Sequence, residues 1–117
     1  HLDTAICPIF NNEYDCIGIN CAKEVFDDKN YKVLKNLCSK HGWELIDIEN
    51  YNQKQSLEAR AAMNALTLPG ILISGAPILS KKVKDFTAAN NIQMHISSVS
   101  QFNLSGGSIH CLTNELF

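Results

Sequence analysis

Hydrophobic and polar residues in the first half of the chain follow the order strand, strand, helix, strand. The elements that this pattern predicts are strands at residues 4–10, 14–21 and 43–48 and a helix ending at about residue 41. Asn11-Asn12-Glu13 is a polar turn, so we expect the first two strands to form a hairpin. Pro8 indicates an edge strand or a bulge, because it has no backbone N–H to donate. Asp27 or Asp28 can cap the helix, and Gly42 is a natural C-terminal stop.

The same spacing predicts which side chains of these elements are buried. Apolar positions in the helix follow the i, i+3, i+4, i+7 pattern at Leu34, Leu37, Cys38 and His41, so we expect this face to pack inward. In the second strand Asp15 and Asn20 are expected at polar positions.

The second half of the chain repeats the order of elements. Its predicted strands are residues 61–68, 70–74, 92–96 and a last strand at 108–113. Pro69-Gly70 is a strong turn signal between the first two of them. A helix follows Pro77 and Ser80 and ends at Asn90-Asn91, where asparagine tolerates the left-handed conformation. The expected buried face of this helix comprises Leu79, Val83, Phe86 and Thr87.

An offset of 49 residues superimposes the two halves. It places Leu34 on Val83, Leu37 on Phe86 and Trp43 on Ile92. The prediction is an α/β fold of two β-β-α-β modules, at about residues 1–50 and 60–117 of a single domain spanning residues 1–117. The polar residues 49–60 form the linker between the modules. Sequence identity between the halves is poor, so the repeat is one of architecture.

Composition excludes several classes of protein. Hydrophobic residues make up 45% of the 117 residues and charged residues 19%, with a net charge of −2. This balance is that of a globular domain and gives no reason to expect a nucleic acid partner or an anionic membrane surface. No apolar run is long enough to span a bilayer, and no signal peptide is visible. We therefore expect a cytoplasmic protein.

The five cysteines do not form a disulfide or zinc pattern. Their number is odd and none belongs to a CxxC pair, so reduced thiols and no metal are expected. Four of them lie in apolar surroundings and are predicted to be small buried hydrophobes. Cys111 differs, because Gly106 and Gly107 precede it and Thr113 follows it. A glycine pair lets the backbone approach a ligand closely, although it also forms simple turns.

His1 and Asp3 are the acid–base candidates. On an extended strand they point to the same face, about 6.6 Å apart along the chain. A histidine there could move a proton while the carboxylate holds a cation, and the alternative is two solvated residues at a mobile end of the chain. His110 neighbours Cys111 but would point to the opposite face of a strand. His41 and His95 have no acidic partner in the pattern, so they are interpreted as structural.

Both ends of the chain together resemble a known family. His1-Leu2-Asp3-Thr4 opening a strand and Gly-Gly-x-x-x-Cys-x-Thr near Cys111 are similar to elements of the guanidine-modifying penteins. These include arginine deiminases, agmatine deiminases, dimethylarginine hydrolases and amidinotransferases. The two motifs stand in the family's order, about 100 residues apart, with β-β-α-β units between them. The family fold is a five-module β/α propeller, so the resemblance implies that this chain is the C-terminal two fifths of such a ring.

The resemblance also implies roles for the three residues. Cys111 would attack the guanidinium carbon of an arginine-like small molecule, without a cofactor. His1 would be the general acid and base, and Asp3 would pair with the guanidinium nitrogens. Water resolving the thiouronium adduct would make the enzyme a deiminase, whereas an amine would make it an amidinotransferase.

The chain departs from the family pattern in one respect, and two alternative functions stay open. Family members supply further acidic substrate contacts from modules upstream of the HxD element, so we expect the isolated chain to be inactive and to need those modules as partners. The alternatives are a non-catalytic α/β module that serves in binding or assembly and an enzyme of other thiol chemistry, such as amide hydrolysis.

Overall fold

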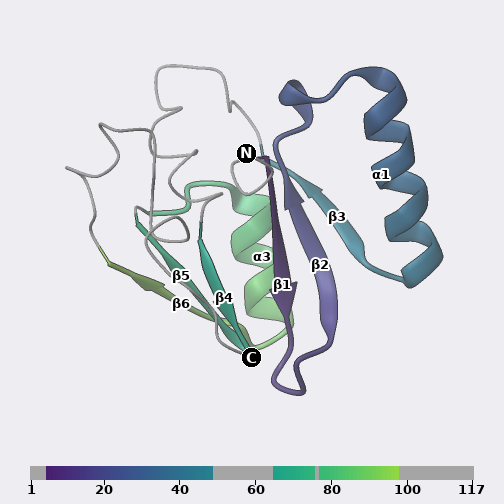
Figure 1. Ribbon diagram of the computed structural model, residues 1–117. Coiled ribbons are helices and arrows are strands. Elements are labelled where there is room, and N and C mark those ends of the chain that lie inside the picture. The colour runs from purple at the N-terminus through teal and green to yellow at the C-terminus, as the bar shows by residue number, and fades with distance from the viewer. Residues whose placement is uncertain (1–4, 49–64, 76, 98–117) are drawn as a thin grey trace.

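The computed structural model describes residues 5–48, 65–75 and 77–97, and these residues form two successive β-β-α-β units. The first unit contains β1 (Ile6–Phe10), β2 (Cys16–Cys21), a short 3-10 helix (Lys23–Val25), α1 (Asp28–His41) and β3 (Glu44–Asp47). β1 and β2 form an antiparallel hairpin, and β3 lies parallel to β2 on its other side (Figure 1). The strand order of the first sheet is therefore β1-β2-β3, with β1 at an edge.

The second unit has the same topology. It contains β4 (Leu66–Leu68), β5 (Ile71–Ser74), α3 (Lys81–Ala89) and β6 (Gln93–Ile96). β4 pairs antiparallel with β5, and β6 pairs parallel with β5, so the second sheet has the order β4-β5-β6. The predicted order of elements is confirmed for the described residues. The predicted strand at residues 108–113 and the first four residues of the one at 61–68 lie outside them.

Local signals in the sequence set the ends of both helices. The Asp27 carboxylate accepts a hydrogen bond from the Asn30 backbone N–H at 2.7 Å, and the Ser80 hydroxyl accepts one from that of Val83 at 3.5 Å. At the C-terminal ends, Gly42 has a φ of 70° and Asn91 a φ of 56°. These two left-handed residues are 49 positions apart, so the structure bears out the predicted offset.

Several predictions of burial are wrong. In α1 only Cys38 is buried, while Leu37 is 43% exposed and His41, the last helical residue, stacks on Trp43 with ring centroids 4.5 Å apart. Leu79 is exposed and Ile78 is buried in its place, because α3 begins at Lys81 and helical spacing does not extend to residues before it. Asn20, expected at a polar position, is 1% exposed.

Helix α3 lies between the two sheets and gives the fold its main core (Figure 1). On one side Thr87 is buried and its hydroxyl lies 3.2 Å from the sulfur of Met94 in β6. On the other side the Phe86 ring packs against Gly18 of β2, where an added Cβ would lie 2.8 Å from a ring atom. The first sheet is consequently covered on both faces, by α1 and by α3.

Neither helix in the described part of the chain is long and apolar enough to cross a membrane.

We predict that Gly18→Ala lowers the free energy of unfolding by about 1–3 kcal/mol, because the new methyl group overlaps the Phe86 ring. Phe86→Leu removes the ring atoms that clash, so the cost of Gly18→Ala should be smaller in that background. Denaturant unfolding of the four members of this double-mutant cycle measures the coupling. Additive effects would show that the close contact between helix and strand does not limit position 18.

Candidate functional site

The three predicted site residues, Cys111, His1 and Asp3, lie outside the described residues, as does His110. Their proximity to one another therefore stays a prediction. The structure describes the scaffold that follows the HxD element and the other chemistry-bearing side chains of the chain.

The chain enters the first sheet directly after the HxD element. Ala5 accepts a hydrogen bond from the backbone N–H of Ala22 at 2.9 Å, and Ile6 is the first residue of β1. Ile6 pairs with Cys21, which pairs in turn with Asp47. β1 thus starts at the end of the sheet where β2 and β3 finish.

A polar cluster lies at this end of the first sheet. The Tyr31 hydroxyl of α1 donates a hydrogen bond to Oδ2 of Asp47 at 2.8 Å, and the Lys23 ammonium lies 4.8 Å from the centre of the Tyr31 ring. Burial, together with this hydrogen bond and the Asp47 charge, raises the pKa of Tyr31 to about 12. A phenol with that pKa is a poor proton donor near neutral pH. The cluster therefore ties α1 to β3 and is not suited to acid–base catalysis.

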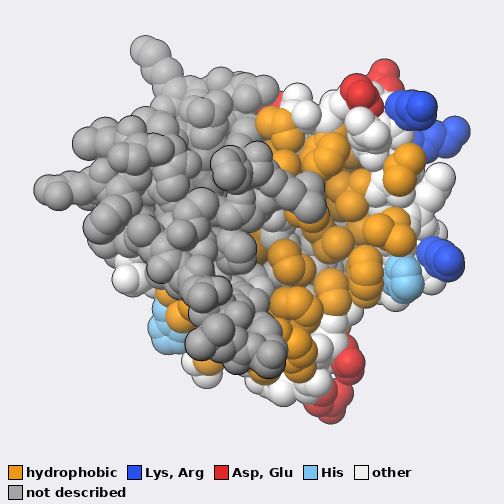
Figure 2. Space-filling model, in the orientation of Figure 1, with side chains coloured by type: hydrophobic (Ala, Val, Ile, Leu, Met, Phe, Trp, Pro, Cys, Tyr) orange, Lys and Arg blue, Asp and Glu red, His pale blue; other side chains and the backbone are white. Residues whose placement is uncertain are grey.

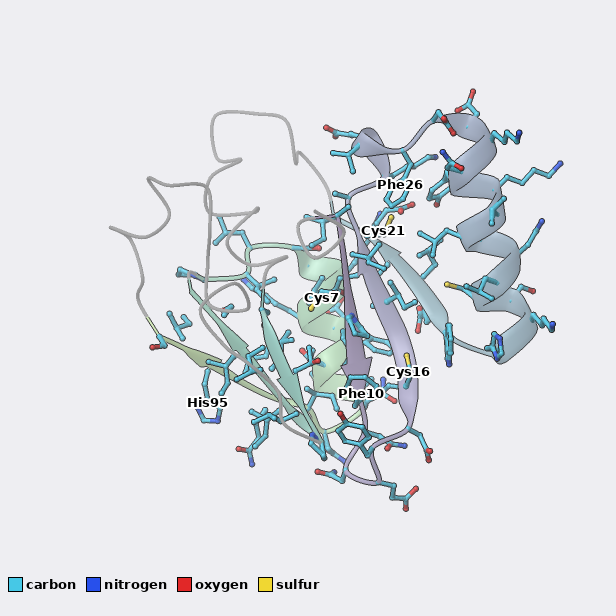
Figure 3. The ribbon with its side chains drawn as sticks, viewed as in Figure 1. Cys7, Phe10, Cys16, Cys21, Phe26 and His95 are labelled. Atoms are coloured by element: carbon cyan, nitrogen blue, oxygen red, sulfur yellow. The ribbon has the colours of Figure 1, made fainter. Side chains whose placement is uncertain are left out.

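The four described cysteines are unsuited to nucleophilic chemistry. Three strand thiols, Cys7, Cys16 and Cys21, belong to the first sheet (Figure 3), and Cys38 lies on α1. Burial raises the pKa of each of them, to about 12 for Cys7 and Cys21. The prediction of buried structural thiols is confirmed for Cys7, Cys21 and Cys38, whereas Cys16 is half-buried. Since the thiolate is the nucleophile, these four are poor candidates.

Asn20 is a polar residue whose environment sequence reasoning missed. It lies on the central strand β2, between Cys7 of β1 and Ile46 of β3, and within the described part of the chain neither atom of its side-chain amide has a hydrogen-bond partner. Burying an amide without a partner costs free energy. The alternation of residues along the strand predicts to which face of the sheet the Asn20 side chain points. It does not predict that both faces of this sheet are covered.

The two described histidines occupy peripheral positions. His41 stacks on Trp43 at the end of α1, and His95 on β6 is exposed with Nε2 3.3 Å from the Gln93 side-chain oxygen (Figure 3). Within residues 5–48, 65–75 and 77–97, no three acidic, histidine or cysteine side chains are grouped closely enough to hold a metal ion.

The β-β-α-β arrangement defines the class of fold. It resembles the pentein fold, and the predicted α/β fold class is confirmed. One similar solved structure is that of ArgZ in its apo form, an arginine dihydrolase from the ornithine-ammonia cycle in cyanobacteria. The match has a TM-score of 0.68 at 21% sequence identity and covers 96% of this chain but 15% of the ArgZ chain. No family model and no curated protein matches the sequence. The likeness shows the fold, and the chain spans about one seventh of that neighbour's length.

The raised pKa values of the buried groups predict a loss of stability in alkali. Cys7 and Cys21 titrate at about 12 in the folded protein but near 9.0 when unfolded, so only the unfolded chain loses these protons just above pH 9. The free energy of unfolding should be constant up to about pH 8.5. It should then fall by about 1.4 kcal/mol per pH unit for each thiol until about pH 12.

Denaturant unfolding at pH 8.0, 9.5 and 10.5 measures this slope. Cys21→Ala should reduce the slope by the contribution of one thiol. Equal stability of the unsubstituted protein at the three pH values would contradict the assignment.

Proposed function

We propose that this chain is part of a thiol-dependent enzyme that modifies a guanidinium substrate, with Cys111 as nucleophile, His1 as general acid and base, and Asp3 as a substrate-binding carboxylate. The observation that carries the proposal is the combination of HLDT and Gly-Gly-x-x-x-Cys-x-Thr with a pair of β-β-α-β units whose fold resembles that of an arginine dihydrolase.

The chemistry suits these three side chains. The Cys111 thiolate adds to the guanidinium carbon, and the bond from that carbon to the leaving nitrogen breaks as His1 donates a proton to the departing amine or ammonia. The neutral imidazole then takes a proton from water, which attacks the same carbon and releases the sulfur as thiolate. Asp3 pairs with the planar cation, whose positive charge in turn favours the thiolate form of Cys111.

The described thiols support the choice of nucleophile. Each of the other four cysteines has a raised pKa caused by burial, which disfavours the reactive form. Cys111 lies outside the described residues, and in the sequence it follows Gly106 and Gly107.

One bidentate carboxylate accepts hydrogen bonds from only two of the N–H groups of a guanidinium, so the proposed site needs further acidic groups. We assign these to β-β-α-β modules upstream of His1 in the same protein. Whether water or an amine resolves the adduct, and hence whether the enzyme is a hydrolase or a transferase, depends on that completed site.

Labelling of Cys111 tests the nucleophile. A chloroacetamidine probe mimics the amidine part of the substrate and should alkylate Cys111 in the full-length protein, as located by peptide mass spectrometry. Cys111→Ala should abolish labelling and reduce turnover at least about 10³-fold. Cys16→Ala, which removes the half-buried described thiol, is the matched control. This variant should retain both the labelling of Cys111 and the turnover. A fully active Cys111→Ala variant would refute the assignment of Cys111 as the nucleophile.

Turnover by the 117-residue chain tests the need for upstream modules. Incubation with arginine or agmatine should release no citrulline, urea or ammonia above background, because Asp3 alone leaves most N–H groups of the guanidinium without an acceptor. Full-length protein is the positive control. Robust turnover by the isolated chain would show that its own residues complete the site.

A further inference from the structure

The side-chain amide of Asn20 is buried among apolar residues of the first unit. Asn20 is 1% exposed, and among the described residues neither its amide nitrogen nor its amide oxygen has a hydrogen-bond partner. Its neighbours on the sheet, Cys7 and Ile46, belong to the hydrophobic core, and Figure 2 shows apolar side chains gathered over β1 and β2 on the outside of the same unit. Burial of an amide costs free energy unless its donor and acceptor are paired, so Asn20 needs a partner beyond the described residues.

The second unit shows that the fold itself does not require a polar residue at this position. Asn20 pairs with Ile46, the third residue of β3, and Ile73 of β5 pairs with His95, the third residue of β6. Asn20 and Ile73 are therefore equivalent, and an isoleucine serves the same place on the central strand of the second sheet. The reason for an amide in the first unit is consequently a hydrogen-bonding partner that belongs to this unit alone.

Asn20 lies at the end of the first sheet that the chain enters after the HxD element. It is the penultimate residue of β2, close to the point where β1 begins. Its side chain points to the face on which Gly18 meets Phe86, because residues two apart in a strand share a face. The neighbouring side chains of Cys7 and Ala22 are small and buried, so they leave room for a segment of backbone to pack directly on the amide.

We propose that Asn20 is a positioning residue of the proposed site and that its amide hydrogen-bonds the backbone of the segment that carries Cys111. This role rests on the proposed function, because a thiol that attacks a guanidinium bound to Asp3 must come to the end of the sheet that the HxD element enters. Gly106 and Gly107 have no side chains, so the backbone of this segment can reach a buried amide. The amide donates to a carbonyl and accepts from an N–H, which together fix the place and the direction of the segment.

The linker that precedes β4 is the competing partner. Ala65, the first described residue after the linker, forms a backbone hydrogen bond with the sulfur of Cys7, which is the sheet neighbour of Asn20. No step of the proposed reaction depends on the linker, whereas the reach of Cys111 depends on where its segment is held. We therefore assign the amide to the segment that carries Cys111, and hydrogen exchange distinguishes the two partners.

Hydrogen exchange of the full-length protein, followed by mass spectrometry, tests the role of Asn20. Asn20→Leu replaces the amide with an apolar side chain of similar size. Residues 105–113 should then exchange at least about 10-fold faster, and the chloroacetamidine probe should alkylate Cys111 at least about 10-fold more slowly. The melting temperature should change by less than about 2 °C, because the hydrophobic core around position 20 is kept.

Thr87→Val is the matched control. It removes a buried hydroxyl that donates a hydrogen bond to the Lys84 carbonyl at 3.0 Å in the second unit. This variant should lower the melting temperature by about 2–4 °C and leave both the exchange of residues 105–113 and the labelling of Cys111 unchanged.

Three results would overturn the role of Asn20. The first is a lower melting temperature of Asn20→Leu with unchanged exchange of residues 105–113, which is the signature of a purely structural amide. The second is faster exchange of residues 50–64 in place of 105–113, which assigns the amide to the linker. The third needs no variant: residues 105–113 of the unsubstituted protein exchange at the rate of an unfolded chain.

The proposed chemistry and the role of Asn20 can fail separately. If Cys111→Ala is fully active while Asn20→Leu speeds the exchange of residues 105–113, the proposed nucleophile is refuted and the anchoring of the segment stands.

Discussion

The Phe86 ring of α3 packs directly against Gly18 of β2, and this contact joins the two β-β-α-β units. Position 18 has no room for a side chain, because a Cβ there would lie 2.8 Å from the Phe86 ring and 3.2 Å from the Glu44 carbonyl oxygen. Through this contact the helix of one unit covers the sheet of the other. Two short three-stranded sheets, each marginal alone, thereby share one hydrophobic core.

That shared core also decides the chemistry of the first unit. Because its sheet is covered by α1 and by α3, the thiols of Cys7 and Cys21 are buried and their pKa values rise to about 12. Burial also contributes to the raised pKa of Tyr31, and among the described residues the buried amide of Asn20 has no hydrogen-bond partner. The three residues of the proposed chemistry, Cys111, His1 and Asp3, lie outside these units in the sequence.

Local signals in the sequence predict the order of the described elements and the ends of both α-helices. Capping side chains at Asp27 and Ser80 and left-handed residues at Gly42 and Asn91 act over a few residues, so local pattern is sufficient to predict them. The 49-residue offset between the two halves is also predicted from local pattern.

Which faces of the helices and sheets are covered depends on contacts between segments that are distant in the sequence. Leu37 and Phe86 occupy equivalent helical positions, yet one is exposed and the other packs on the core, because the first sheet covers α3 and no described element covers α1 in the same way. The burial of Asn20 and the exposure of Leu79 differ from the predictions for a related reason. Asn20 is buried by elements distant in the sequence, and Leu79 is exposed because it lies before the start of α3. Periodicity gives the direction of a side chain, and its burial depends on what packs there.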